Sequence, residues 1–170
     1  FLRRDKEQKK PRETGEAWHL LAALLGVSIV WWIQILRSQE SLTLPPILFA
    51  VVAISLLAHE LSQKLVARKL GLETTFKAWG SGILLGWLLA LVGGFFPAHG
   101  STYIKQLDWW YEPKRDKTGI VFAIGPTVSL ALAFAFWTLS NLTTGSLLVA
   151  SGRAGYTINI VIVIFNLIPI

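Results

Sequence analysis

Long apolar stretches separated by short polar segments run through this chain and predict helices that cross a membrane. A helix needs roughly 20 consecutive, mostly apolar residues to span a bilayer. Stretches of about that length lie at 17–36, 47–65, 118–139 and 154–170. Nothing between them is long enough to fold alone. We therefore predict an all-α polytopic membrane protein with about four transmembrane helices, in a single membrane domain of residues 17–170.

A further apolar stretch, residues 79–97, differs from the others because glycine interrupts it repeatedly. Lys and Arg lie on both sides of it, and positive charge marks the cytoplasmic side of a membrane protein. The pattern predicts a re-entrant hairpin that enters and leaves on one side, with its backbone buried in protein or lining a cavity. Residues 72–78 alternate in character and are expected to pair, as a short β-strand, with a second strand at 98–104. The interrupting glycines are Gly80, Gly82, Gly86, Gly93 and Gly94.

The composition agrees with a membrane protein, since 53% of the residues are hydrophobic, 15% are charged and the mean hydropathy is +0.53. A soluble domain has about 25% charged residues. The absence of cysteine excludes disulfides and thiolate metal sites. The net charge of +6 does not indicate nucleic-acid binding, because 6 of the 16 Lys and Arg residues lie within residues 1–12. We expect residues 1–16 to be a basic cytoplasmic tail that contacts anionic lipid.

The two ends of the chain indicate a fragment. No methionine occurs, even at position 1, and the last apolar stretch stops at Ile170 without a polar flank. We therefore expect the last predicted helix to be truncated at the C-terminus.

A His-Glu pair, His59 and Glu60, lies inside the second apolar stretch. Ionisable residues in a membrane helix are costly and usually functional. In the zinc-protease pattern H-E-x-x-H, two histidines four residues apart share one helix face and bind a metal, while the glutamate acts on its water. Here the second histidine position holds Gln63. The pair predicts a functional site, roughly 18 Å from the start of its helix at 1.5 Å per residue.

Two more motifs follow in the chain, Gly-Pro-Thr-Val-Ser at 125–129 and Asn-Leu-Ile-Pro at 166–169. With the His-Glu helix, they resemble the site-2 protease family of intramembrane zinc metalloproteases, of the prokaryotic and archaeal type. Members of that family carry H-E-x-x-H, G-P-x-x-N and N-x-x-P-x-x-P-L-D-G in this order. The resemblance covers roughly residues 45–170, and it implies close helix packing at Gly125 with a kink at Pro126.

The resemblance also implies roles for individual residues. His59 would be a zinc ligand, and Glu60 would be the general base that passes a proton from zinc-bound water to the leaving amine. Asn166 would hold the substrate strand beside the metal. The alternative for Asn166 is an amide that satisfies the broken backbone near Pro169.

Three departures from the family pattern argue against activity. Gln63 replaces the second ligand, and a neutral amide is a poor zinc donor. Ser129 stands where the family has asparagine, and the aspartate that is the third ligand would lie beyond Ile170. His99, at the exit of the predicted hairpin, is a conceivable replacement ligand, but a loop position at the membrane interface is favoured.

We therefore expect a site-2-protease-like intramembrane zinc metallopeptidase for transmembrane substrates that is inactive as written, a pseudoenzyme with weak or no zinc binding. The alternative is a non-catalytic, protease-derived membrane subunit or scaffold in a complex. A piece of a transporter or channel is a third possibility, resting only on the glycine-rich hairpin. The expected partners are a transmembrane protein and the lipid bilayer, with no nucleic acid.

The Lys and Arg distribution also predicts the topology of this multi-pass protein. Residues 1–16 and 105–117 are expected to face the cytoplasm, and 37–45 and 140–153 to lie outside. Because the chain has no cysteine, single introduced cysteines can report exposure to a membrane-impermeant thiol reagent. We expect labelling of 105–117 from the cytoplasmic side. Labelling of that segment only from outside would contradict a re-entrant 79–97.

Overall fold

The computed structural model describes residues 15–37, 45–96, 99–105 and 115–167. Within these ranges the chain forms α1 (Glu16–Arg37), α2 (Pro45–Lys69), β1 (Glu73–Ala78), α3 (Gly80–Leu91), β2 (Gly100–Lys105), α4 (Arg115–Leu142) and α5 (Ser146–Leu167). Helices α1, α2, α4 and α5 are long and apolar enough to cross a membrane. The predicted all-α polytopic membrane fold is confirmed.

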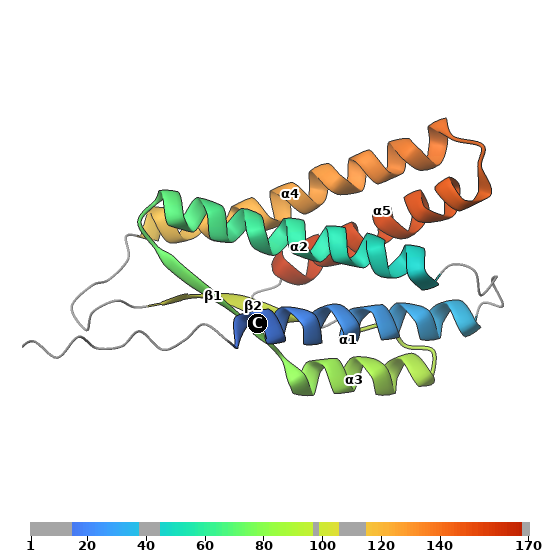
Figure 1. The fold of residues 1–170 in the computed structure, drawn as a ribbon, viewed down its shortest axis with the longest axis horizontal. Helices are drawn as coiled ribbons and strands as arrows, with labels where there is room; N and C mark the ends of the chain where they lie inside the picture. Colours follow the sequence, from blue (N-terminus) through green and yellow to red (C-terminus); the bar gives the residue numbers. More distant parts are fainter. Residues whose placement is uncertain (1–14, 38–44, 97–98, 106–114, 168–170) are drawn as a thin grey trace, which may run out of the picture.

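Helix α2 lies in the middle of the bundle (Figure 1). It contacts α4 and α5 on one side and α1 on the other, while α3 packs against α1 farther out. A core cluster joins the central helices through Val27 of α1, Val52 of α2 and Ile158 of α5. Of the apolar window in α2, 44% is buried inside the protein, against 28% or less in the other three long helices. Polar groups on α2 are therefore the best shielded from lipid.

The predicted hairpin is present as a helix that goes out and an extended limb that returns. β1 and β2 pair antiparallel, with Glu73 opposite Lys105 and Ala78 opposite Gly100. Between the strands, α3 runs alongside α1, and the chain reverses after it through Gly93, which has φ 91°. The aromatic rings of Phe95 and Phe96 then pack back against α1 and α5.

Helix α1 supplies the hydrogen bonds that the tip of this hairpin needs. Arg37 Nη1 donates to the carbonyl of Leu91 (2.9 Å), and Gln34 Nε2 donates to the carbonyl of Gly94. Lower down, Trp87 Nε1 of α3 donates to the carbonyl of Gly26 (3.0 Å). Free carbonyls in a lipid environment cost several kcal/mol each, so these contacts stabilise the non-helical backbone of the hairpin.

Helix α5 begins at Ser146, eight residues before the predicted start of the last span at residue 154, and takes up part of the segment 140–153 that was expected outside the membrane. In the structure Gly152 is a helix-packing residue, since a Cβ there would lie 2.7 Å from the Ser140 Cβ of α4. Small residues let membrane helices approach closely, and Gly155 makes the same kind of contact with Phe136. The other three predicted spans lie within α1, α2 and α4.

The close approach of the returning limb to α3 generates a test. A Cβ added at Gly86 would clash with the carbonyl oxygen of Phe96, whereas nothing lies within 4 Å of one added at Gly80 in the same helix. We expect Gly86→Ala to lower the free energy of unfolding in detergent by about 1–3 kcal/mol, and Gly80→Ala to leave it nearly unchanged. Equal effects of the two substitutions would contradict the packing of the hairpin.

Candidate functional site

Helix α2 carries the predicted site residues into the centre of the bundle. His59 is fully buried, and Glu60 and Gln63 are 6% and 4% exposed. Four residues separate His59 from Gln63, so the two side chains lie on one face of the helix. That face points toward α4, while Glu60 points toward the β-strands. The sequence pattern therefore places the three side chains in protein rather than against lipid.

Both ring nitrogens of His59 have hydrogen-bond partners. Nδ1 lies 2.9 Å from Ser129 Oγ of α4, and Nε2 lies 3.2 Å from the Gln63 amide nitrogen. An amide nitrogen only donates, so Nε2 accepts from Gln63. The ring proton then resides on Nδ1, which donates to Ser129. This arrangement uses the Nε2 lone pair that a metal ion would need.

Helix α4 reaches His59 at the Gly-Pro motif. A Cβ on Gly125 would lie 2.6 Å from His59 Nε2 and closer still to the Gln63 amide, so only glycine fits here without displacing these side chains. Pro126 is buried beside it, inside α4. The close packing that the motif implied is therefore directed at the His59–Gln63 pair.

The returning limb of the hairpin surrounds Glu60. Thr102 Oγ1 of β2 donates to Glu60 Oε2, and His99 Nε2 lies 4.0 Å from Glu60 Oε1. His99 is 6% exposed, and its ring stacks on Phe76 with 6.5 Å between centroids. His99 lies in a loop position just before β2, as expected, but it is buried in the protein.

The strand register explains how His99 enters the site. Phe76 pairs with Thr102 and is itself buried, so the face of the sheet that bears both residues is turned inward. Gly100, with φ 146°, interrupts the alternation and brings His99 to that same side. The signal available in the sequence was a glycine, Gly100, inside the predicted strand 98–104.

Helix α5 contributes two asparagines. Asn166 Nδ2 donates to the carbonyl of Ile162 (2.8 Å), and its side chain lies close enough to the His59 ring to interact with it. Asn159 is fully buried, and its amide donates to Ser55 Oγ of α2 (2.8 Å), one helical turn before His59. The sequence analysis had not singled out Asn159, although its spacing of seven residues from Asn166 puts both on one helix face. Pro169 lies outside the described residues.

These donors do not fit a catalytic zinc ion. Catalytic zinc takes three protein ligands from imidazole, carboxylate or thiolate groups and keeps one water. Within the residues that the structure describes, no three His, Cys, Asp or Glu side chains are grouped so as to hold a metal. The groups that contact His59 are the Ser129 hydroxyl, the Gln63 and Asn166 amides and the Gly125 backbone, and His99 interacts with it at longer range.

Comparison with known proteins finds a similar protein whose name includes metalloprotease. This chain is similar to a protein of Methanocaldococcus jannaschii whose name provisionally assigns it as a zinc metalloprotease, with 40% identity over 114 residues. The aligned part is 66% of this chain and 58% of that protein, so the chain spans little more than half of its relative. The similarity supports a metalloprotease relationship. No protein-family profile and no solved structure matches the chain.

The contact of Gly125 with the His59–Gln63 pair can be tested within α4. We expect Gly125→Ala to lower the free energy of unfolding by about 1–3 kcal/mol, because the new methyl group overpacks the site. Gly119→Ala is the matched control, since nothing lies within 4 Å of that position.

Shortening the Gln63 side chain should relieve its clash with a methyl group added at position 125. In an SDS titration followed by tryptophan fluorescence, Gly125→Ala combined with Gln63→Ala should cost less than the sum of the two single changes. Strict additivity would show that position 125 does not contact Gln63.

Proposed function

We propose that this chain is an intramembrane metallopeptidase relative of the site-2 protease type in which residue 63 has disabled the metal centre. The observation that carries the proposal is the hydrogen bond from the Gln63 amide to His59 Nε2 (3.2 Å). Gln63 stands where the family pattern has a second histidine. Its amide donates to the Nε2 lone pair of His59, which a metal ion would otherwise use. As the sequence stands, zinc-dependent peptide hydrolysis is not expected from it.

Three further observations support the intramembrane part of the proposal. The His59 site lies in the most buried of four helices that are long enough to cross a membrane. One residue of each family motif, His59 of α2, Gly125 of α4 and Asn166 of α5, lies at the site. The 40% identity to a protein named as a zinc metalloprotease is independent of these contacts.

A transmembrane polypeptide is the partner that such a site would take. Glu60 of α2 and His99 of the returning limb lie 4.0 Å apart (Oε1 to Nε2) inside the bundle, so a segment inserted between α2 and that limb would meet polar side chains. The same observation about Gln63 favours the second candidate function, a non-catalytic subunit that binds a membrane protein without cleaving it. Measuring bound zinc distinguishes an active metallopeptidase from a disabled relative and from a non-catalytic subunit.

Restoring the second imidazole tests the role of residue 63. We expect the unmodified chain to retain no stoichiometric zinc after dialysis, and Gln63→His to bind zinc at least about tenfold more tightly, a gain of about 1.4 kcal/mol. The physical reason is that two imidazoles on one helix face share the ion, whereas Gln63 offers a neutral amide. Elemental analysis and a competition titration measure this.

The controls come from the same chain. Tyr156→His introduces an equal imidazole at an exposed position of α5 and should leave zinc binding unchanged, while His59→Ala should abolish the gain given by Gln63→His. Stoichiometric, tightly bound zinc in the unmodified chain would contradict the proposal, since Gln63 would then not block the metal centre.

A further inference from the structure

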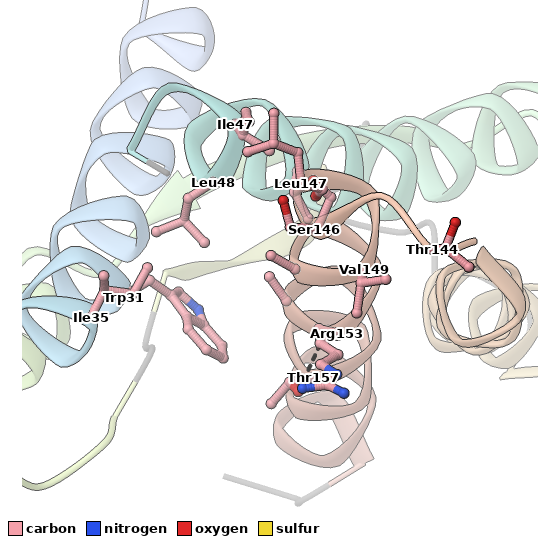
Figure 2. Close-up of a pocket in the computed structure, with 14 residues that line it drawn as sticks. Trp31, Ile35, Ile47, Leu48, Thr144, Ser146, Leu147, Val149, Arg153 and Thr157 are labelled. Carbon is pink, nitrogen blue, oxygen red and sulfur yellow. Dashed lines mark hydrogen bonds between the residues drawn. The ribbon is translucent and has the colours of Figure 1, made fainter. Parts of the chain in front are cut away.

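A second feature of the molecule, separate from the His59 site, is a cavity of about 710 Å³ between α1, α2 and α5 (Figure 2). Trp31 and Ile35 extend into it from α1, and Leu48 lies on its α2 side. The first half of α5 forms the remaining wall, including Leu147 and Arg153. None of the residues assigned to the His59 site lines this cavity. Its size is within the roughly 300–1,000 Å³ of small-molecule sites.

The charge in this cavity is Arg153. It stands seven residues after the start of α5, which is roughly 10 Å along the helix. A cation at that depth in a membrane helix is normally paired or reaches the interface. The described part of the chain offers it no carboxylate, because all described acidic residues lie toward the opposite end of the bundle. They are Glu16, Glu60, Glu73 and Asp116.

The hydroxyl groups near Arg153 do not replace the guanidinium as donors to an anion. Thr157 Oγ1 donates to the carbonyl of Arg153 itself (2.9 Å), and Ser151 Oγ donates to the carbonyl of Leu147 (2.7 Å). Each hydroxyl has a single proton, and that proton is used within α5. Arg153 is therefore the charged donor for an anionic ligand, and the hydroxyls of Thr144 and Ser146 also line the cavity.

We propose that the cavity binds one anionic phospholipid, with an acyl chain between α1 and α5 and its phosphate paired with Arg153. The apolar walls match an acyl chain. The guanidinium of Arg153, which has no carboxylate partner among the described residues, matches a phosphate, which arginine binds in bidentate geometry. The bilayer itself supplies both groups in one molecule.

A second copy of this chain fits the cavity less well than a lipid does. In a parallel copy, Glu16, Glu73 and Asp116 would again lie toward the end opposite Arg153 and Glu60 would be buried inside the bundle, so its described part would leave this charge unpaired. An antiparallel copy would have to insert in the membrane in the reverse orientation, against the rule that fixes orientation by positive charge.

Lipid titration followed by native mass spectrometry tests the proposal on the delipidated 170-residue protein in detergent. We expect one palmitoyl-oleoyl phosphatidylglycerol to bind with an apparent Kd at least about fivefold lower than the matching phosphatidylcholine, since both have the same chains and only one has a net charge. Arg153→Gln should remove this preference. Arg68→Gln, at the exposed end of α2 far from the cavity, should retain it.

Two further variants keep the result interpretable. Arg153→Lys keeps the charge and should keep a preference for phosphatidylglycerol, which guards against a folding defect in Arg153→Gln. Ala150→Trp fills the cavity and should weaken binding of both lipids. Glycerol 3-phosphate, which has the anion without the chains, should not displace the bound lipid.

Four outcomes would overturn the proposal. They are equal affinity for the two lipids, equal loss in Arg153→Gln and Arg68→Gln, displacement by glycerol 3-phosphate alone, and a dimer that Arg153→Gln dissociates. Displacement of phosphatidylglycerol by an acidic transmembrane peptide but by no other lipid would also reject it, in favour of a polypeptide occupant.

Discussion

The structure depends on the satisfaction of polar groups on α2 inside an otherwise apolar bundle. Inside a membrane, a buried amide, imidazole or carboxylate has no water with which to form a hydrogen bond, and each unpaired group costs several kcal/mol. Ser55, His59, Glu60 and Gln63 therefore each need a partner from another element or from their own helix. Asn159, Ser129 and Thr102 supply these partners from α5, α4 and β2. The hairpin that β1, α3 and β2 form is needed for this reason, since it brings β2 to the glutamate.

Close backbone contacts make the arrangement possible. Gly125 lets α4 approach the imidazole, Gly152 and Gly155 let α5 pack on α4, and Gly86 lets the returning limb pass beside α3. In lipid, van der Waals packing at small residues replaces much of the hydrophobic driving force between helices. These glycines at helix contacts are thus structural requirements of the fold, and a side chain at Gly125 would displace the very groups that the motif positions.

Much of this could be predicted from the sequence, and the misses have physical causes. The apolar runs gave three of the four spans, and the paired basic flanks of 79–97 predicted the hairpin. The start of α5 was missed because Gly152 and Arg153 look like loop residues until α4 is known to pack against them. His99 was assigned to the interface because its burial depends on the strand register and on the turn at Gly100. The Gln63–His59 bond requires side-chain geometry that no spacing rule supplies.

The central claim is that the Gln63 amide occupies His59 Nε2, and ¹⁵N NMR of histidine-labelled protein tests it most directly. The chain has three histidines, so His19→Gln and His99→Gln identify the His59 signals. The account predicts a neutral ring protonated on Nδ1, with an Nε2 resonance that does not move when zinc is added. It also predicts that Gln63→Ala makes that resonance sensitive to zinc. A zinc-induced shift of His59 Nε2 in the unmodified protein would contradict the account.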